Sequence, residues 1–250
     1  MHHHAAEFEE FYASSSSKKK KYIDETLRIT DLNIVLSKRL VTMITNKAPK
    51  AKVVVLYNAV NTYDKNPYNE NAHNILFLGR LGKRKGTYDL LVAIKDLDKI
   101  IDRNIKFYIC GDGDVTGVTE KIKEYGIEKR IEYIGWIDGK QKKEFMNNSM
   151  INVLPSYNEG LPMTILETMA YGIPNISTKI ASIPEVIHDG EDGYIITPGD
   201  VEKLEECLKK LCINKELRKK ISDKSWREIT EKFAMDSHIC QLKKYISEVV

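Results

Sequence analysis

Short apolar segments rich in β-branched residues alternate along the chain with longer segments that have a helical apolar period. The strand-like segments are KVVVLY (52–57), NILFLG (74–79), IKFYICG (105–111), IEYIG (131–135), MINVLP (150–155), IPNIST (173–178) and GYIIT (193–197). Helical segments separate most of them and fill residues 200–249. Strands that alternate with helices form βα units, and these units build a mostly parallel sheet covered on both faces. We therefore predict an α/β, doubly wound fold whose ligand binds beyond the carboxyl ends of the strands.

Residues 1–60 differ from the rest, because they supply two helical patterns and only one strand, KVVVLY. One strand with its helices buries too little surface to close a core. A polar stretch at 61–74 then follows as a linker would. We predict three parts: an incomplete remnant of another domain at 1–60, a Rossmann-like domain at 61–232 and a C-terminal helix at 233–250.

The composition excludes several classes of protein. The 250 residues are 42% hydrophobic, and 39 lysines and arginines face 36 aspartates and glutamates, so no nucleic-acid partner is expected. The four cysteines have no CxxC spacing, which favours buried thiols of a cytosolic protein. No apolar run approaches the ~20 residues that span a bilayer. We expect a cytoplasmic protein.

One segment stands out by its charge. The sequence SSSSKKKK (14–21) leads into YIDETLRI (22–29), which has an amphipathic helical pattern. Such a segment is attracted to anionic lipids and would give peripheral association with the cytoplasmic membrane face. The alternative, which we favour, is a solvated loop before a helix.

Two glutamates bracket a short apolar stretch in NEGLPMTILE (158–167). Pro162 suits the first turn of a helix and Gly172 suits the residue after its end, which predicts a helix at about 161–171. Glu159 then precedes the helix and Glu167 lies about two turns along it. Because an unpaired buried carboxylate is costly, each needs a partner, and a ligand rich in hydroxyl groups would supply one.

The loop GRLGKRKG (79–86) concentrates positive charge between a strand and a helix. Gly79 lets the backbone approach a ligand, and Arg80 and Lys85 are among four cations that precede the helix near Gly86. A helix N-terminus already favours anions. The loop therefore suits a phosphate or diphosphate, with a basic solvated turn as the alternative.

The loop GDGDVTG (111–117) admits two further interpretations. It does not satisfy GxGxxG, so it gives little support to a nicotinamide-dependent oxidoreductase. That hypothesis has only this loop behind it. Asp112 and Asp114 form a DxD triplet, which binds divalent metals in some sugar-transferring enzymes. Carboxylates in a turn are more often capping residues, and we favour that interpretation.

The combined motifs resemble a known family. NEGLPMTILETMAYGIPNIST resembles the E-x7-E signature of retaining glycosyltransferase family 4, and GRLGKRKG, YICGDGD, YIGW and IPEVIHDGEDGYIITPGD occur in that family's order. The resemblance implies a GT-B architecture, in which two Rossmann-like domains face each other across a cleft. The C-terminal domain, here 61–232, would hold the nucleotide sugar, and the helix at 233–250 would cross back onto the other domain.

The resemblance also implies roles for particular residues. Arg80 and Lys85 match the pair that neutralises the donor diphosphate, Glu159 the carboxylate on the donor sugar, and Glu167 the carboxylate on the ribose. The remaining matches are backbone contacts to sugar and phosphate at Gly160, Leu161 and Met163, the face for the base at Gly135 and Trp136, and a histidine of the N-terminal domain at His4. Family members are generally metal-independent, so no metal or other cofactor is expected.

The function implied is retaining transfer of a hexosyl group from a nucleotide sugar, with uridine expected as the base. The acceptor would be a polysaccharide or glycolipid of the cell surface, such as capsule or lipopolysaccharide. An acceptor domain needs ~100 residues more than 1–60 supplies. The alternative is therefore a truncated, non-catalytic fragment that binds a nucleotide sugar or a partner. The segment ASIPE also departs from the family, which has a glycine pair where Ala181 and Ser182 stand.

Overall fold

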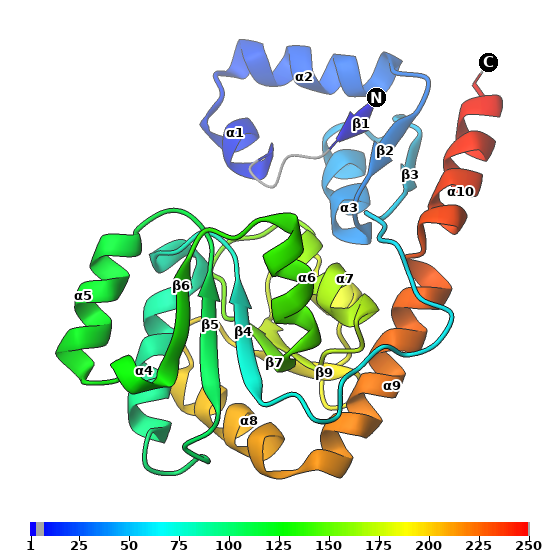
Figure 1. The fold of residues 1–250 in the computed structure, drawn as a ribbon. Coiled ribbons are helices and arrows are strands. Elements are labelled where there is room, and N and C mark those ends of the chain that lie inside the picture. The colour runs from blue at the N-terminus through cyan, green and yellow to red at the C-terminus, as the bar shows by residue number, and fades with distance from the viewer. Residues whose placement is uncertain (4–7, 250) are drawn as a thin grey trace.

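The computed structural model describes residues 1–3 and 8–249, and these residues contain a small and a large parallel sheet (Figure 1). The large sheet has six strands in the order β6-β5-β4-β7-β8-β9, all parallel. Its strands are β4 (Asn74–Leu78), β5 (Lys106–Cys110), β6 (Ile131–Gly135), β7 (Ser149–Leu154), β8 (Asn175–Thr178) and β9 (Gly193–Ile196). Each was predicted from its apolar run.

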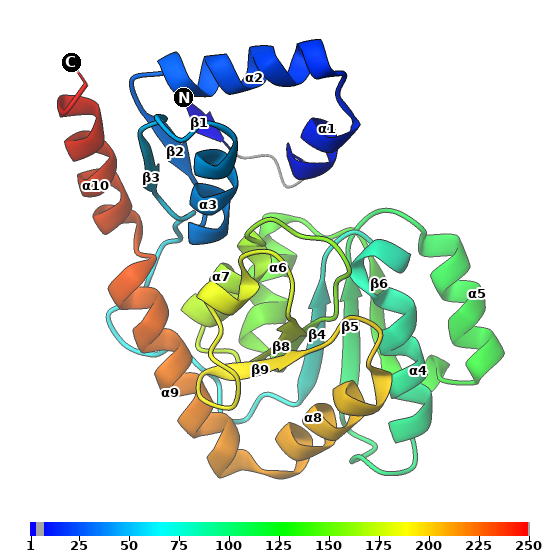
Figure 2. The ribbon, with the colours of Figure 1, turned by 180° about the vertical axis from the view of Figure 1, so that it is seen from behind.

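Helices cover both faces of the large sheet, which confirms the predicted doubly wound α/β fold. Helices α4, α5 and α8 pack on one face, and α6 and α7 lie side by side on the other (Figures 1 and 2). These helices are α4 (Thr87–Leu97), α5 (Val115–Tyr125), α6 (Gly139–Asn147), α7 (Met163–Ala170) and α8 (Val201–Ile213). Side chains of β4 alternate between the layers: Ile75 and Phe77 join one apolar cluster and Leu76 joins the other.

The small sheet corrects the expectation of a single strand in residues 1–60. It has three parallel strands in the order β1-β2-β3. Its elements are β1 (His2–His3), α1 (Phe8–Ser14), α2 (Ser17–Ile29), β2 (Asn33–Val35), α3 (Lys38–Lys47) and β3 (Val53–Val55). The strands β1 and β2 were missed because two or three residues are too few to establish a period. Leu27 of α2 and Met43 and Ile44 of α3 form the core of this sheet with Val35.

The lysines at 18–21 lie within α2, so the favoured interpretation, a loop before a helix, was wrong. Ser16 is the N-cap, and its side chain accepts a hydrogen bond from the Lys19 backbone N–H. A serine cap satisfies one of the free N–H groups of the first turn, which starts the helix before the lysines.

The chain passes between the two sheets near Val60 and again between α9 (Lys215–Lys232) and α10 (Met235–Ser247). The backbone of Val60 exchanges hydrogen bonds with Phe233 and Met235, at the point between these two helices. Beyond this point α10 runs beside β3 (Figure 1), and the Tyr245 hydroxyl donates to the Val55 carbonyl at 3.3 Å. Across the described residues, each helix is too short or too polar to cross a bilayer.

Candidate functional site

The centre of the large sheet contains the point where its winding direction reverses. The chain proceeds outward from β4 through β5 to β6, and then outward on the other side from β7 through β8 to β9. In open α/β sheets, ligands bind beyond the carboxyl ends of the strands at this switch point. The loops that follow β4 and β7 therefore frame the candidate site, and both were singled out from their sequences.

Lys85 and Glu159 meet at this point. The Lys85 Nζ lies 2.5 Å from Glu159 Oε1, and the two side chains are 15% and 5% exposed. The Ser156 hydroxyl donates to the same oxygen at 2.8 Å. Glu159 thus has the partner that a buried carboxylate needs, and the partner is a cation expected to contact phosphate.

The loop after β4 is held closely against the end of β7. Gly86 has φ 70°, and a Cβ added there would overlap the carbonyl oxygen of Pro155. The Tyr157 N–H also donates to the Arg84 carbonyl at 2.9 Å. Gly79 lies beside the Lys85 side chain. This close approach fixes Lys85 next to the loop that carries Glu159.

Arg80 differs from Lys85, because its side chain is exposed. Among the residues that the structure describes, no hydrogen bond or ion pair engages Arg80. A guanidinium in this state retains its five donors for a ligand. Lys85 and Glu159 therefore contact each other, whereas Arg80 is exposed to solvent on the same loop as Lys85.

The helix between the two glutamates is α7, which begins at Met163 after the extended Pro162 and ends before Gly172 at φ 66°. The predicted helix is therefore correct, with its start two residues later than expected. Glu167 is half-buried and forms an ion pair with Lys142 of α6 at 2.5 Å. The two glutamates thus have different lysine partners.

A pocket of about 400 Å³ lies beside this second pair, between α6, α7 and the linker near Val60. Its lining includes Met163, Glu167, Lys142, Tyr63 and Met235. Tyr63 also packs edge-on against Tyr171, with ring centroids 5.2 Å apart. The pocket combines apolar walls with one ion pair, a composition typical of small-molecule sites.

The residues expected near a base lie at the end of β6. Gly135 is buried, and its carbonyl accepts the Gly111 N–H at 2.8 Å. The Trp136 side chain is 67% exposed. Asp138 caps α6 with a capping box, so Trp136 lies just before the helix that carries Lys142.

The loop between Glu159 and α7 is supported from two sides. The Gly160 carbonyl accepts the Ser182 N–H at 3.3 Å, and the Leu161 carbonyl accepts the Asn58 side-chain N–H at 3.4 Å. Ala181, which stands where the family prefers glycine, has φ 46°. A non-glycine residue in this left-handed region stores strain, and such strain concentrates at functional loops.

Other predicted residues have structural explanations or fall outside the described part. His4 lies outside the described residues. Asp114 is the N-cap of α5, and its carboxylate accepts N–H from Gly117 at 3.0 Å. The hydroxyl of Tyr88 donates to the same carboxylate at 2.5 Å, which lowers the pKa of Asp114. This arrangement agrees with the capping interpretation.

One group of three side chains of metal-ligand type comes together within the described ranges: His188, Asp192 and Glu228. Both Asp192 oxygens are used by His188, through its backbone N–H at 2.7 Å and its Nδ1 at 2.6 Å. Glu228 pairs with Lys232 at 2.8 Å. The group is thus held together by contacts within the chain.

The four cysteines carry free thiols, but they are not uniformly buried as expected. Cys110 and Cys207 are buried, whereas Cys240 is exposed on α10. Burial raises the pKa of the Cys110 thiol to about 12 and that of Cys207 to about 11. Thiols with raised pKa are poor nucleophiles, so both act as core residues.

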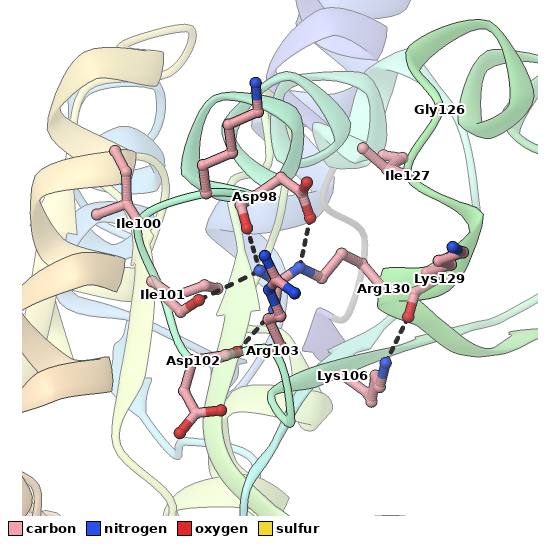
Figure 3. Close-up of a pocket in the computed structure, with 11 residues that line it drawn as sticks. Asp98, Ile100, Ile101, Asp102, Arg103, Lys106, Gly126, Ile127, Lys129 and Arg130 are labelled. Carbon is pink, nitrogen blue, oxygen red and sulfur yellow. Dashed lines mark hydrogen bonds and ion pairs between the residues drawn. The ribbon is translucent and has the colours of Figure 1, made fainter.

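A separate pocket of about 710 Å³ opens at the opposite end of the sheet, near the first residues of β5 and β6 (Figure 3). Arg130 fills its floor: Nε donates to Asp98 Oδ1 at 2.6 Å, and Nη1 donates to the Asp102 carbonyl at 2.7 Å. It also donates to the carbonyls of Asp98, Ile101 and Ile105. The guanidinium is fully used in closing these turns, which favours a structural role.

Two residues near the site were missed from the sequence. Lys142, the partner of Glu167, is one of several lysines in a polar helix. Glu185 lies in a short 3-10 turn, and its carboxylate contacts residues more than 120 positions away. No local pattern marks such a contact. The available signal was that Glu185 lies in the segment IPEVIHDGEDGYIITPGD, which matches the family.

Comparison with known proteins identifies the family of this chain. The family model for glycosyl transferases group 1 matches residues 61–227. An uncharacterized glycosyltransferase of Methanocaldococcus jannaschii is 30% identical over 204 residues, which are 80% of this chain and 55% of that protein. The amylovoran biosynthesis glycosyltransferase AmsD of Erwinia amylovora is 30% identical over 172 residues, which are 68% of this chain and 47% of AmsD.

A solved structure with a similar fold is HepE of Anabaena in complex with UDP. It has a TM-score of 0.82 and 17% identity, and the match covers 94% of this chain and 69% of HepE. The chain belongs to the glycosyl transferases group 1 family, or glycosyltransferase family 4, and its large sheet is the C-terminal domain of a GT-B fold. The resemblance read from the motifs is confirmed. The chain spans about half the length of the curated relatives it matches.

Proposed function

We propose that this chain binds a nucleotide sugar, with UDP as the nucleotide, and contributes to the retaining transfer of its hexosyl group to a polysaccharide or glycolipid. The observation that carries the proposal is the buried Lys85–Glu159 pair at the switch point of the sheet. It joins a cation suited to phosphate and a carboxylate suited to sugar hydroxyls within one hydrogen-bond length.

The cations would act on the leaving group. Breaking a glycosyl–phosphate bond builds negative charge on the departing diphosphate, and preorganised charges are most effective where charge develops. Lys85 is held in place by its loop, and Arg80 is exposed beside it. A diphosphate that enters this site would share Lys85 with Glu159 and recruit Arg80.

The two glutamates would read different parts of the donor. Glu159, next to Lys85, would accept hydrogen bonds from the sugar hydroxyls. Glu167 would accept them from the ribose, and its half-exposed pair with Lys142 leaves it accessible from the adjacent pocket. The backbone near Gly135 and the exposed Trp136 would face the base. HepE, which shares the fold, has been solved with UDP and with UDP-glucose.

Calorimetry with UDP and UDP-glucose tests the proposal. We expect saturable binding, and we expect Arg80→Ala to weaken it at least about tenfold, because a charge-assisted hydrogen bond contributes about 1.5–3 kcal/mol. Glu167→Ala should weaken binding as well. Arg103→Ala, an exposed arginine at the opposite end of the sheet, is the matched control. Absence of binding to any nucleotide sugar would refute the proposal.

A transfer assay separates the enzyme from a donor-binding fragment. Incubation with UDP-glucose and a lipid-linked sugar acceptor, followed by NMR of the product anomer, reports both transfer and its stereochemistry. Transfer with retention supports the proposal. Binding without transfer supports the alternative, in which this chain binds the donor and does not catalyse.

We place this reaction in the cytoplasm, since the four cysteines carry free thiols and disulfides are typical of oxidising compartments. The four lysines at the start of α2 would attract the chain to the inner membrane face, where it would meet a lipid-linked acceptor. Sedimentation with anionic and neutral vesicles tests this. Equal binding to both vesicle types would contradict it.

A further inference from the structure

Glu185 connects the small sheet to the donor site. It lies in the 3-10 turn Ile183–Glu185, which follows β8 at the carboxyl edge of the large sheet. We propose that Glu185 is a positioning residue: its carboxylate caps helix α3 of the small sheet and thereby holds the loop around Gly160 in its binding conformation. The part that concerns the donor rests on the proposed function.

The cap consists of three hydrogen bonds to one half-buried carboxylate. The backbone N–H groups of Lys38 and Arg39 donate to Glu185 at 2.9 and 3.3 Å, and the Tyr57 hydroxyl donates at 2.8 Å. Lys38 and Arg39 are the first two residues of α3. A carboxylate at a helix N-terminus satisfies free N–H groups and interacts favourably with the helix dipole.

Helix α3 has no negative charge of its own at its N-terminus. Its first turn reads Lys38-Arg39-Leu40 and contains no acidic residue. The Ser37 side chain accepts the Leu40 N–H at 3.3 Å. The N–H groups of Lys38 and Arg39 donate instead to Glu185, which lies in the turn after β8 of the large sheet. The start of α3 is therefore complete only when the small sheet is docked on the large one.

Short connections lead from this cap to the candidate sugar site. The Glu185 N–H donates to the Ser182 carbonyl at 3.0 Å, and the Ser182 N–H donates to the Gly160 carbonyl. Asn58, next to Tyr57, reaches the Leu161 carbonyl. A shift of α3 away from Glu185 would thus loosen both supports of the loop that follows Glu159.

Hydrogen–deuterium exchange with residue-level fragmentation tests the cap without any nucleotide. In Glu185→Ala we expect the amides of Lys38 and Arg39 to exchange about tenfold faster, which is the effect of losing a helix cap. Glu185→Gln, which keeps one acceptor oxygen, should rescue part of the protection. Unchanged exchange in β4 and β7 will verify that the variants are folded. Glu132→Ala, at an exposed carboxylate of β6, is the matched control.

Calorimetry on the same variants tests the coupling. We expect Glu185→Ala to reduce the ratio of UDP-glucose affinity to UDP affinity by about fivefold or more, because the supported loop follows Glu159, which would bind the sugar. Unchanged exchange at Lys38 and Arg39 overturns the cap. A wild-type ratio in Glu185→Ala overturns the coupling. If the wild-type chain binds neither nucleotide, the proposed function and the donor coupling fail, and the exchange result still decides the cap.

Discussion

Removal of the Lys85 charge should destabilise the chain strongly. The Glu159 side chain is 5% exposed, and without Lys85 its side-chain partner among the described residues is the Ser156 hydroxyl. Breaking a buried ion pair by removing one partner costs about 3–5 kcal/mol, because the other charge stays buried without compensation. We therefore expect Lys85→Met to lower the free energy of unfolding by about 3 kcal/mol or more.

Urea denaturation followed by circular dichroism measures this loss, and an unchanged m-value verifies that the unfolding transition is comparable. The control is Lys203→Met, which removes one partner of an exposed pair with Glu206, with side chains 47% and 62% exposed. Exposed pairs contribute about 0–1 kcal/mol.

A double variant adds a stricter test. Lys85→Met combined with Glu159→Gln removes both charges and leaves an amide that still accepts from Ser156. It should recover at least half of the lost stability, since no unpaired charge remains. If Lys85→Met costs no more than Lys203→Met, the pair does not carry a buried charge and the reasoning about the site is refuted.

Three further outcomes are expected. Arg130→Met should cost about 3 kcal/mol or more in urea denaturation, because buried carbonyl acceptors lose their donor, whereas Arg103→Met in the same pocket should cost under about 0.5; similar losses would contradict the structural role. Gly86→Ala should destabilise more than Gly126→Ala, since both have positive φ but only the former meets backbone atoms; equal losses would exclude the clash. A hydrogen bond to the α5 cap raises the pKa of Tyr88 from 10.0 to about 12. Its contribution to stability should be complete below pH 10 and decline as the pH rises towards 12, so the stability deficit of Tyr88→Phe should shrink over that range.

The large sheet was predictable because its strands are four to six residues long and lie within segments rich in apolar and β-branched residues, separated by helical segments. Glycine and proline marked the loops between them. The small sheet was not predictable to the same degree. The three residues of β2 are too few to establish a period, and this strand is defined by its pairing with β3. The lysines of α2 misled in another way, because charge suggested a loop where Ser16 had already started a helix.

The sequence by itself determined the parallel α/β architecture, the basic loop after one strand and the glutamate before α7. These features depend on local periodicity, on glycine and proline, and on residue type. Only the tertiary structure decided the partners: Glu159 with Lys85, Glu167 with Lys142, and Glu185 with the start of α3. These partners are 74, 25 and 147 residues apart in the chain. A contact at such separation depends on how strands and helices pack, which no neighbouring residue encodes.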